Sequence, residues 1–191
     1  LWAAMKSGRS VKWTSDRTEA FLTDAHGRDH VSSAKIGFDK DGMIVGLKVE
    51  TKANLGAYMS LFSSAVPTYL YATLLSGQYN IANIYCNVQA VYTNTVPVDA
   101  YRGAGRPEAC YVIERIMETA AREMGVDPSE LRAKNFVTSF PHQTPVIMAY
   151  DSGDFVANQK QAQDAADVVG FAARKSEAAT RGKLRGLGYS N

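Results

Sequence analysis

Alternating apolar and polar residues in the first half of the chain predict a β-hairpin followed by a third strand. Residues 30–39 and 43–54 alternate with a period of two, and Lys40-Asp41-Gly42 between them supplies the Asp-Gly pair typical of a hairpin turn. Residues 83–94 alternate in the same way. One face of this third strand would carry Ile84, Cys86, Val88, Ala90 and Tyr92.

Apolar residues at helical spacing predict a long helix in the second half. Pro107 suits the first helical position, the Glu108 carboxylate favours the positive end of the helix dipole, and Gly125 supplies the C-terminal stop. The apolar stripe between them consists of Ala109, Val112, Ile113, Ile116, Met117, Ala120, Ala121 and Met124. This stripe predicts that one side of the helix packs against the rest of the fold.

Further helices are predicted beyond this long one. Asp127, which is followed by a proline and an acidic residue, caps a helix that reaches about Phe136. Residues 138–153 contain two prolines and are predicted to form a connecting loop. The Ala-rich residues 155–181 predict two helices separated near Gly170.

Two other stretches of the first half predict short or irregular structure. Val11–Thr14 is a strand candidate, and Ser15 or Asp16 is suited to cap a brief helix after it. Residues 55–78 are apolar and aromatic but broken by glycine, proline and serines, so they are predicted to be irregular with some helix.

The two ends of the chain indicate a piece of a longer protein. Residues 1–8 (LWAAMKSG) lack an initiator methionine and resemble the last two turns of a helix ended by Gly8. Residues 185–191 (RGLGYSN) are predicted to begin a strand. Together with the elements above, they predict an α+β fold in which a β-hairpin and further mixed or antiparallel strands pack with several helices.

Composition narrows the class of protein without identifying it. The 191 residues are 46% hydrophobic and 21% charged, as in an ordinary soluble globular protein, and a net charge of +2 does not favour a nucleic-acid partner. Neither a signal peptide nor an apolar run of about 18 residues is visible, so no membrane span is expected. A solvated helical face is expected to carry Arg174, Lys175, Arg181, Lys183 and Arg185.

The two cysteines restrict the redox chemistry that the chain can host. Cys86 and Cys110 form no CxxC motif and cannot supply the four thiolates of an iron–sulfur cluster, so any such centre must lie elsewhere. Free buried thiols in the cytoplasm are the favoured interpretation, with a disulfide as the alternative. Cys110 is interpreted as a core residue rather than a nucleophile, because no partner base is visible.

The three histidines do not predict a metal site. His26 and His30 are four residues apart, but Gly27 lies between them and the segment leads into a strand, where this spacing does not bring two side chains together. His142 stands alone in a loop. Metal ligation by side chains of this chain is therefore not expected.

The candidate chemistry lies in residues 99–117, DAYRGAGRPEACYVIERIM. Gly103 and Gly105 allow a close backbone approach just ahead of a helix N-terminus, and Arg102 and Arg106 flank them, a combination that can bind an anion or stabilise charge on a reacting oxygen. An anionic ligand or a nearby carboxylate such as Asp99 or Glu108 would balance the arginines. A purely structural turn is the alternative, and the third glycine of a dinucleotide fingerprint and a Walker A lysine are both absent.

These residues resemble a known family. AYRGAGRPEA and the following YVIERIMETAAREMGVDPSELRAKNF are similar to the large, molybdenum-cofactor-binding subunit of the xanthine dehydrogenase, aldehyde oxidase and carbon monoxide dehydrogenase group. VKWTSDRTEAFL, SGQYNIANIY, VYTNTVPVDAYRGAGRPE and YDSGDF resemble the same subunit in the same order. The resemblance covers nearly the whole chain.

The resemblance implies a chemistry that spacing alone does not show. Such enzymes hydroxylate small molecules oxidatively at a molybdenum bound to molybdopterin, and electrons leave through iron–sulfur clusters and FAD in other domains or subunits. By resemblance, Arg102 is an active-site residue that balances negative charge, and Gly103, Ala104 and Gly105 form the turn beside the metal. Arg106 matches a position that is arginine in many relatives.

Two departures from the family pattern bear on activity. Carbon monoxide dehydrogenases carry a cysteine where this chain has Gly103, and that thiolate holds copper beside molybdenum, so oxidation of an aldehyde or an N-heteroaromatic carbon is expected instead. The family's GGxFG loop and its catalytic glutamate, the general base, lie outside these residues. The isolated chain is therefore expected to be inactive.

The expected organisation follows from the resemblance. Residues 1–153 would be part of the molybdopterin-binding domain, with the strands, the glycine-rich loop and two helices, and residues 154–191 a helical segment that leads into the rest of the subunit. The rest of the large subunit and the iron–sulfur and FAD units are the implied partners. The alternatives are a noncatalytic scaffold or subunit-contact domain, a nucleotide-binding module and a carbon monoxide dehydrogenase-like subunit.

Overall fold

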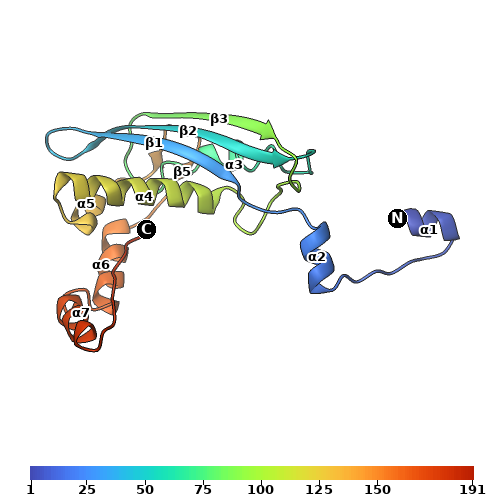
Figure 1. The fold of residues 1–191 in the computed structure, drawn as a ribbon. Helices are drawn as coiled ribbons and strands as arrows, with labels where there is room; N and C mark the ends of the chain where they lie inside the picture. Colours follow the sequence, from blue (N-terminus) through green and yellow to red (C-terminus); the bar gives the residue numbers. More distant parts are fainter.

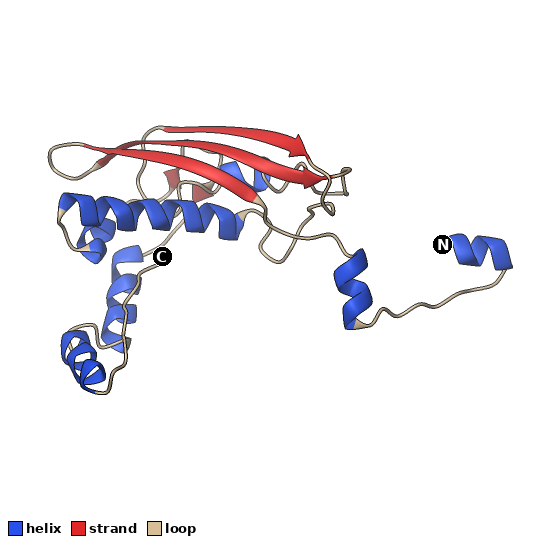
Figure 2. Cartoon of the chain, viewed as in Figure 1, coloured by secondary structure: helices blue, strands red, loops and turns tan.

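A computed structural model describes residues 1–191, and its centre is a three-stranded sheet covered on one face by a long helix (Figure 1). The strands are β1 (His30–Phe38), β2 (Ile44–Gly56) and β3 (Ile84–Tyr92), in the order β1-β2-β3. The long helix is α4 (Arg106–Met124). The three-stranded sheet in one layer and α4 in the other form the centre of the predicted α+β fold (Figure 2).

The predicted hairpin is confirmed as the antiparallel pair β1–β2. Its turn is closed by the Asp39 carboxylate, which accepts hydrogen bonds from the backbone N–H groups of Asp41 and Met43, both at 2.9 Å. Gly42 adopts φ +78°, a left-handed conformation that glycine tolerates without strain. Along β2 buried and exposed residues alternate, so one face of the sheet is buried beneath α4 and the other is open to solvent.

The third predicted strand is also present, and it pairs with β2 in parallel. A parallel partner requires a crossover, and residues 57–83 provide it with only the short helix α3 (Tyr69–Ala72), as predicted for an irregular region. Tyr71 in α3 is fully buried in the core. Of the predicted apolar face of β3, Ile84, Cys86 and Val88 pack against the core, whereas Ala90 and Tyr92 are exposed.

The long helix matches its prediction closely. It begins at Arg106 with Gly105 as N-cap, one residue before the predicted start, and ends at Gly125 in the left-handed conformation. Its stripe contributes Ala109, Ile113, Met117, Ala120 and Ala121 to the buried core. At the edges of the stripe, Val112 and Ile116 are partly buried and Met124 is exposed.

The following helix α5 (Pro128–Asn135) is held against α4 by buried polar groups that the apolar pattern did not indicate. Asp127 caps it as predicted, accepting from the N–H groups of Ser129 and Glu130. The fully buried Arg132 side chain donates Nε–H to Glu114 Oε2 at 2.9 Å. Sequence periodicity does not reveal such pairs, because they require polar residues on the buried side of both helices.

The C-terminal part contains the two predicted helices, α6 (Phe155–Ala165) and α7 (Phe171–Thr180), with Gly170 as N-cap of the second. The predicted loop 138–153 holds a small antiparallel pair, β4 (His142–Gln143) and β5 (Ala149–Tyr150), that was not expected. The predicted basic face is helical only at Arg174 and Lys175, because α7 ends at Thr180 and the other three residues follow it. All five are exposed except Arg174, which is partly buried against Asp167. None of the helices combines the length and apolarity needed to cross a bilayer.

The N-terminal helices α1 (Trp2–Ser7) and α2 (Arg17–Thr23) lie away from the sheet (Figure 1). Gly8 ends α1 and Asp16 caps α2, as predicted. The strands predicted at Val11–Thr14 and in residues 185–191 are wrong. Both segments lack a neighbouring strand, and alternation alone cannot make a strand without a hydrogen-bonding partner.

Candidate functional site

The five predicted site residues, Arg102 to Arg106, form one tight turn at the N-terminus of α4. The Ala104 N–H donates to the Tyr101 carbonyl at 2.8 Å, and the Arg106 N–H donates to the Gly103 carbonyl at 3.1 Å. Gly103, Ala104 and Gly105 have φ values of +97°, +31° and +87°. This run of left-handed residues explains the two glycines, because a side chain is disfavoured in that conformation.

Gly105 also fixes where the turn lies. A Cβ atom at this position would come within 2.4 Å of the main-chain carbonyl carbon and oxygen of Leu70, in α3. The backbone of the turn therefore packs directly on the backbone of the crossover segment. Only glycine allows this approach, so the contact determines how closely the backbone of the turn packs on the backbone of α3.

The turn carries hydrogen-bond donors and positive charges that have no acceptor or carboxylate partner within the chain. Arg102 and Arg106 are exposed and take part in no ion pair. The N–H groups of Gly103 and Gly105 donate no hydrogen bond within the chain. Two guanidinium groups and two free N–H groups around one turn fit an anionic group such as a phosphate, in the manner of other anion sites at helix N-termini.

The two carboxylates expected to balance these arginines have other partners. Asp99 accepts hydrogen bonds from the Ser60 hydroxyl and from the Phe62 N–H at 3.1 Å. The Ser60 hydrogen bond is the main reason that the pKa of Asp99 lies below its usual range. Glu108 lies nearest to Arg28, with 3.8 Å between Oε1 and Nε.

Arg28 is a charged residue beside the turn that sequence reasoning missed. Its Nη2–H donates to the main-chain carbonyl of Arg102, and its guanidinium lies 4.9 Å from the centre of the Tyr101 ring. Seventy-four residues separate Arg28 from Arg102, and no spacing rule joins positions so far apart. Only the fold brings the two together.

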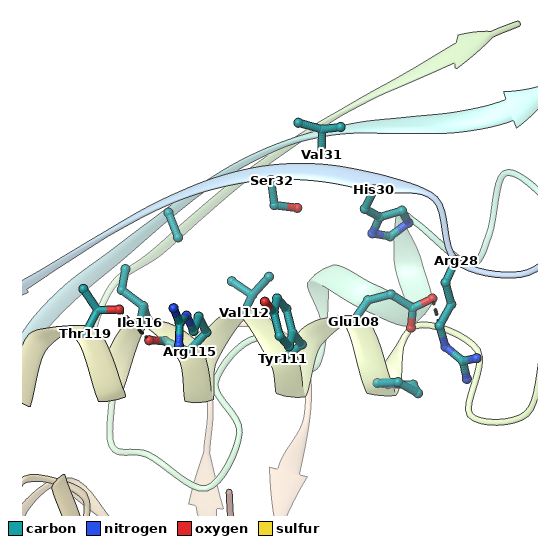
Figure 3. Close-up of a pocket in the computed structure, with 12 residues that line it drawn as sticks. Arg28, His30, Val31, Ser32, Glu108, Tyr111, Val112, Arg115, Ile116 and Thr119 are labelled. Atoms are coloured by element: carbon teal, nitrogen blue, oxygen red, sulfur yellow. Dashed lines mark hydrogen bonds and ion pairs between the residues drawn. The ribbon is translucent and has the colours of Figure 1, made fainter. Parts of the chain in front are cut away.

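A cavity of about 700 Å³ between β1 and α4 adjoins this cluster (Figure 3). Glu108 on α4 points towards His30 on β1, with Arg28 beside the carboxylate. The Glu108 side chain is only 7% exposed, and neither of its oxygens accepts a hydrogen bond. Burial lowers the pKa of His30, and the nearby Glu108 and Asp29 carboxylates oppose that effect only in part.

The remaining candidates lie apart from the turn or play local roles. His26 forms a backbone bridge with Val98, and no group of three or more metal-ligating side chains is present. Cys86 and Cys110 are free thiols, as favoured from the sequence. The prediction that Cys110 is a core residue is wrong, because it is only partly buried and its Sγ lies 3.6 Å from the Ser190 hydroxyl.

Comparisons with known proteins point in one direction. The profile of the family described as "Molybdopterin cofactor-binding domain" matches residues 1–136. The carbon monoxide dehydrogenase large chain of Hydrogenophaga pseudoflava is 39% identical over 181 residues, which cover 91% of this chain and 22% of the relative. The nicotine 6-hydroxylase large subunit of Paenarthrobacter nicotinovorans is 31% identical over 182 residues, covering 94% of this chain and 22% of the relative.

The fold has solved counterparts in the same group of enzymes. The crystal structure of quinoline 2-oxidoreductase from Pseudomonas putida 86 superposes with a TM-score of 0.86 at 28% identity. The superposition covers 95% of this chain and 23% of that one. The chain therefore spans less than a quarter of the length of these three proteins.

Proposed function

We propose, because this chain belongs to the molybdopterin cofactor-binding domain family, that it forms one wall of the cofactor and substrate pocket in the large subunit of a molybdenum hydroxylase. The observation that carries the proposal is the turn from Arg102 to Arg106, where two guanidinium groups without ion-pair partners flank free backbone N–H groups. When bound, the cofactor supplies the redox chemistry of oxidative hydroxylation. The reaction proposed is hydroxylation of an aldehyde or of a carbon in an N-heteroaromatic ring.

Each residue of the turn has a proposed role. Arg102 faces the reacting centre and balances negative charge on the substrate and in the transition state. Gly103, Ala104 and Gly105 bring the backbone close to the cofactor, and Arg106 holds an anionic part of it through the forked guanidinium. The general base is proposed to come from another part of the large subunit, because the glutamate that the family resemblance assigns to this role lies outside these residues.

The proposed surroundings follow the relatives. Two of them are named as large chains or subunits, which implies partner subunits in those enzymes. For this protein we propose iron–sulfur and FAD units as electron acceptors, the rest of the large subunit as the other wall of the pocket, and a cytoplasmic location. Residues 1–153 would belong to the molybdopterin-binding domain, and residues 154–191 would lead into the rest of the subunit.

Gly103 argues for hydroxylation rather than carbon monoxide oxidation, the second candidate, which the 39% identical relative favours. A copper ion beside molybdenum needs a soft thiolate ligand, and Gly103 offers none. Cys110 follows more than one helical turn along α4 and points to Ser190. CO-dependent dye reduction by the fully loaded enzyme, with copper and molybdenum quantified together, tests this choice. Robust turnover with copper near one per molybdenum would contradict it.

Replacement of Arg102 in the intact large subunit tests the main proposal. Arg102→Ala should lower turnover by about 10²- to 10³-fold, the loss typical of removing one preorganised donor, and Arg102→Lys should restore little because it lacks the fork. The control is Arg122→Ala, which removes an exposed arginine near the C-terminal end of α4, away from the turn. Unchanged kinetics of Arg102→Ala at full molybdenum content would show that Arg102 is structural.

Two assays separate the noncatalytic alternatives. A scaffold or subunit-contact domain predicts an intact subunit without molybdenum, which metal analysis would reveal. A nucleotide-binding module predicts that free nucleotides bind at the turn, which calorimetry would detect. The proposed function requires stoichiometric molybdenum and no binding of free nucleotide to the loaded enzyme at this turn.

A further inference from the structure

Arg28 lies in a backbone segment that is hydrogen-bonded to the residues just before the turn from Arg102 to Arg106, the proposed anion site. The His26 N–H donates to the Pro97 carbonyl at 2.9 Å, and the Asp99 N–H donates to the His26 carbonyl at 2.7 Å. These bonds run residues 26–28 alongside the strand-like segment that leads into the turn. The segment thereby brings Arg28 to the turn from a distant part of the sequence.

The backbone of Arg28 is itself unusual. Its φ is +51°, in the left-handed region that residues with a side chain seldom adopt. Such a conformation persists only where the surroundings hold it, and it is often found where a side chain must point in one direction. At Arg28 the result is that the guanidinium reaches the turn.

The Arg28 guanidinium bridges the two parts that define the turn. On one side it donates to the main-chain carbonyl of Arg102, and on the other it lies 3.8 Å from the Glu108 carboxylate on α4. Glu108 is 7% exposed and accepts no hydrogen bond, so Arg28 is the cation that compensates its charge. The Tyr101 ring covers the guanidinium. Arg28 thus joins the backbone of the residue that precedes Gly103 to the first turn of the helix.

We infer that Arg28 is a positioning residue for Arg102, which it holds by the main chain so that the Arg102 guanidinium leaves the turn in one direction. The Arg102–Gly103 peptide is the central peptide of the turn that the Ala104 N–H closes onto the Tyr101 carbonyl. Gly103 has no side chain to restrict its torsion angles, so without the bridge this central peptide can flip while that hydrogen bond is kept. The inference rests on the proposed catalytic role of Arg102. Arg28 would act through Arg102, because its donors are directed at a backbone carbonyl and a buried carboxylate.

The test replaces Arg28 by glycine in the intact, cofactor-loaded enzyme. Glycine accepts φ +51° without strain, so Arg28→Gly removes the guanidinium and leaves the backbone conformation available. Turnover should fall by about 10- to 10²-fold at unchanged molybdenum content, the loss expected when a catalytic group is displaced by about 1 Å. Arg28→Lys should recover only part of it, because one ammonium group cannot serve both the carbonyl and the carboxylate.

A double-mutant cycle distinguishes positioning from a general structural role. If Arg28 acts through Arg102, adding Arg28→Gly to Arg102→Ala should lower turnover by less than about 2-fold more. The matched control is Arg174→Ala, since Arg174 also donates to main-chain carbonyls, also pairs with a carboxylate and is equally exposed at 33%, but lies in α7. Arg174→Ala should leave turnover unchanged.

Each outcome decides between the two proposals. The positioning role alone would be overturned if Arg28→Gly lowered turnover by the same factor with and without the Arg102 side chain. It would also be overturned if Arg28→Gly were fully active while Arg102→Ala was strongly impaired. Full activity of Arg102→Ala would remove the proposed function as well. If Arg28→Gly fails to fold or to load molybdenum, the same cycle is measured with Arg28→Lys, and full activity of that variant would also overturn the positioning role.

Discussion

Arg102 and Arg106 flank two glycines in the sequence, and in the structure both side chains are exposed and without ion-pair partners. The local pattern was sufficient to predict the turn, because a glycine-rich turn before a helix is formed by residues that are neighbours in sequence. Arg28 could not be found in this way, because its contact with Arg102 depends on the fold. At the scale of single residues, sequence therefore indicates the turn but not what holds it.

Glycine serves the turn in two ways, by adopting a left-handed backbone and by allowing a close contact with α3, and substitution can separate the two effects. Gly105→Ala should lower the free energy of unfolding by at least about 2 kcal/mol, because it adds a close contact with Leu70 to the cost of a left-handed backbone. Gly125→Ala is the control, with φ +69° and open space around a Cβ atom, and should cost only about 1 kcal/mol. Urea denaturation of the chain measures both, and equal losses would show that α3 moves aside.

The partly buried imidazole of His30 predicts a pH dependence of stability. Because burial holds its pKa below the ordinary value, the folded state favours neutral His30, and its stabilising effect is present above about pH 6.5 and lost as the pH falls through the lowered pKa. Thermal unfolding between pH 7.5 and about pH 5 should show a fall in stability that is smaller in His30→Gln. Identical profiles for the two proteins would assign the fall to other groups.

Elements were predicted well where their signals are local. The caps at Asp16 and Asp127 and the stop at Gly125 lie within one turn of the helices that they delimit, so a short window of sequence contains them. The way α5 packs on α4 was not predicted, because it combines the apolar Leu131 with a buried ion pair that no apolar stripe indicates. Arg132 donates to Glu114 Oε2 and also to Glu118 Oε2, at 2.9 and 3.3 Å.

Loss of this ion pair should weaken the junction between the two helices. Arg132→Met should lower the free energy of unfolding by about 3–5 kcal/mol, because it leaves the Glu114 carboxylate buried without its cation. Arg122→Met is the matched control, since Arg122 bonds the same Glu118 from an exposed position, and should cost less than about 1 kcal/mol. Chemical denaturation compares them, and similar losses would show that the buried pair contributes no more than the exposed one.

For the whole molecule, the sequence predicted the α+β class, and the family resemblance is confirmed by the match over residues 1–136. The strands predicted at Val11–Thr14 and in residues 185–191 are wrong. A strand needs a hydrogen-bonding neighbour, and the alternation of residues within a segment does not show whether another strand lies beside it. The parallel pairing of β3 with β2 was also beyond a local pattern. The sequence thus predicted the individual elements better than it predicted which elements pair with one another.

The isolated chain should retain neither molybdenum nor hydroxylase activity. It supplies one proposed wall of the pocket and spans less than a quarter of the relatives, so most of the proposed contacts to the cofactor are missing. Metal analysis and a dye-reduction assay on the purified chain check this, with circular dichroism as the control for folding. Stoichiometric molybdopterin in the folded chain would contradict it.

The contact between Gly105 and Leu70 has a consequence for the order in which the protein assembles. The hairpin joins neighbours in sequence and can form early, whereas the turn from Arg102 to Arg106, the proposed anion site, needs residues near 28, 70 and 105 to meet. A partly folded chain with intact helices and hairpin would therefore have no cradle for an anion. If the proposed function holds, uptake of the cofactor would have to wait until these three parts of the chain meet, and it would report on completed tertiary folding rather than on secondary structure.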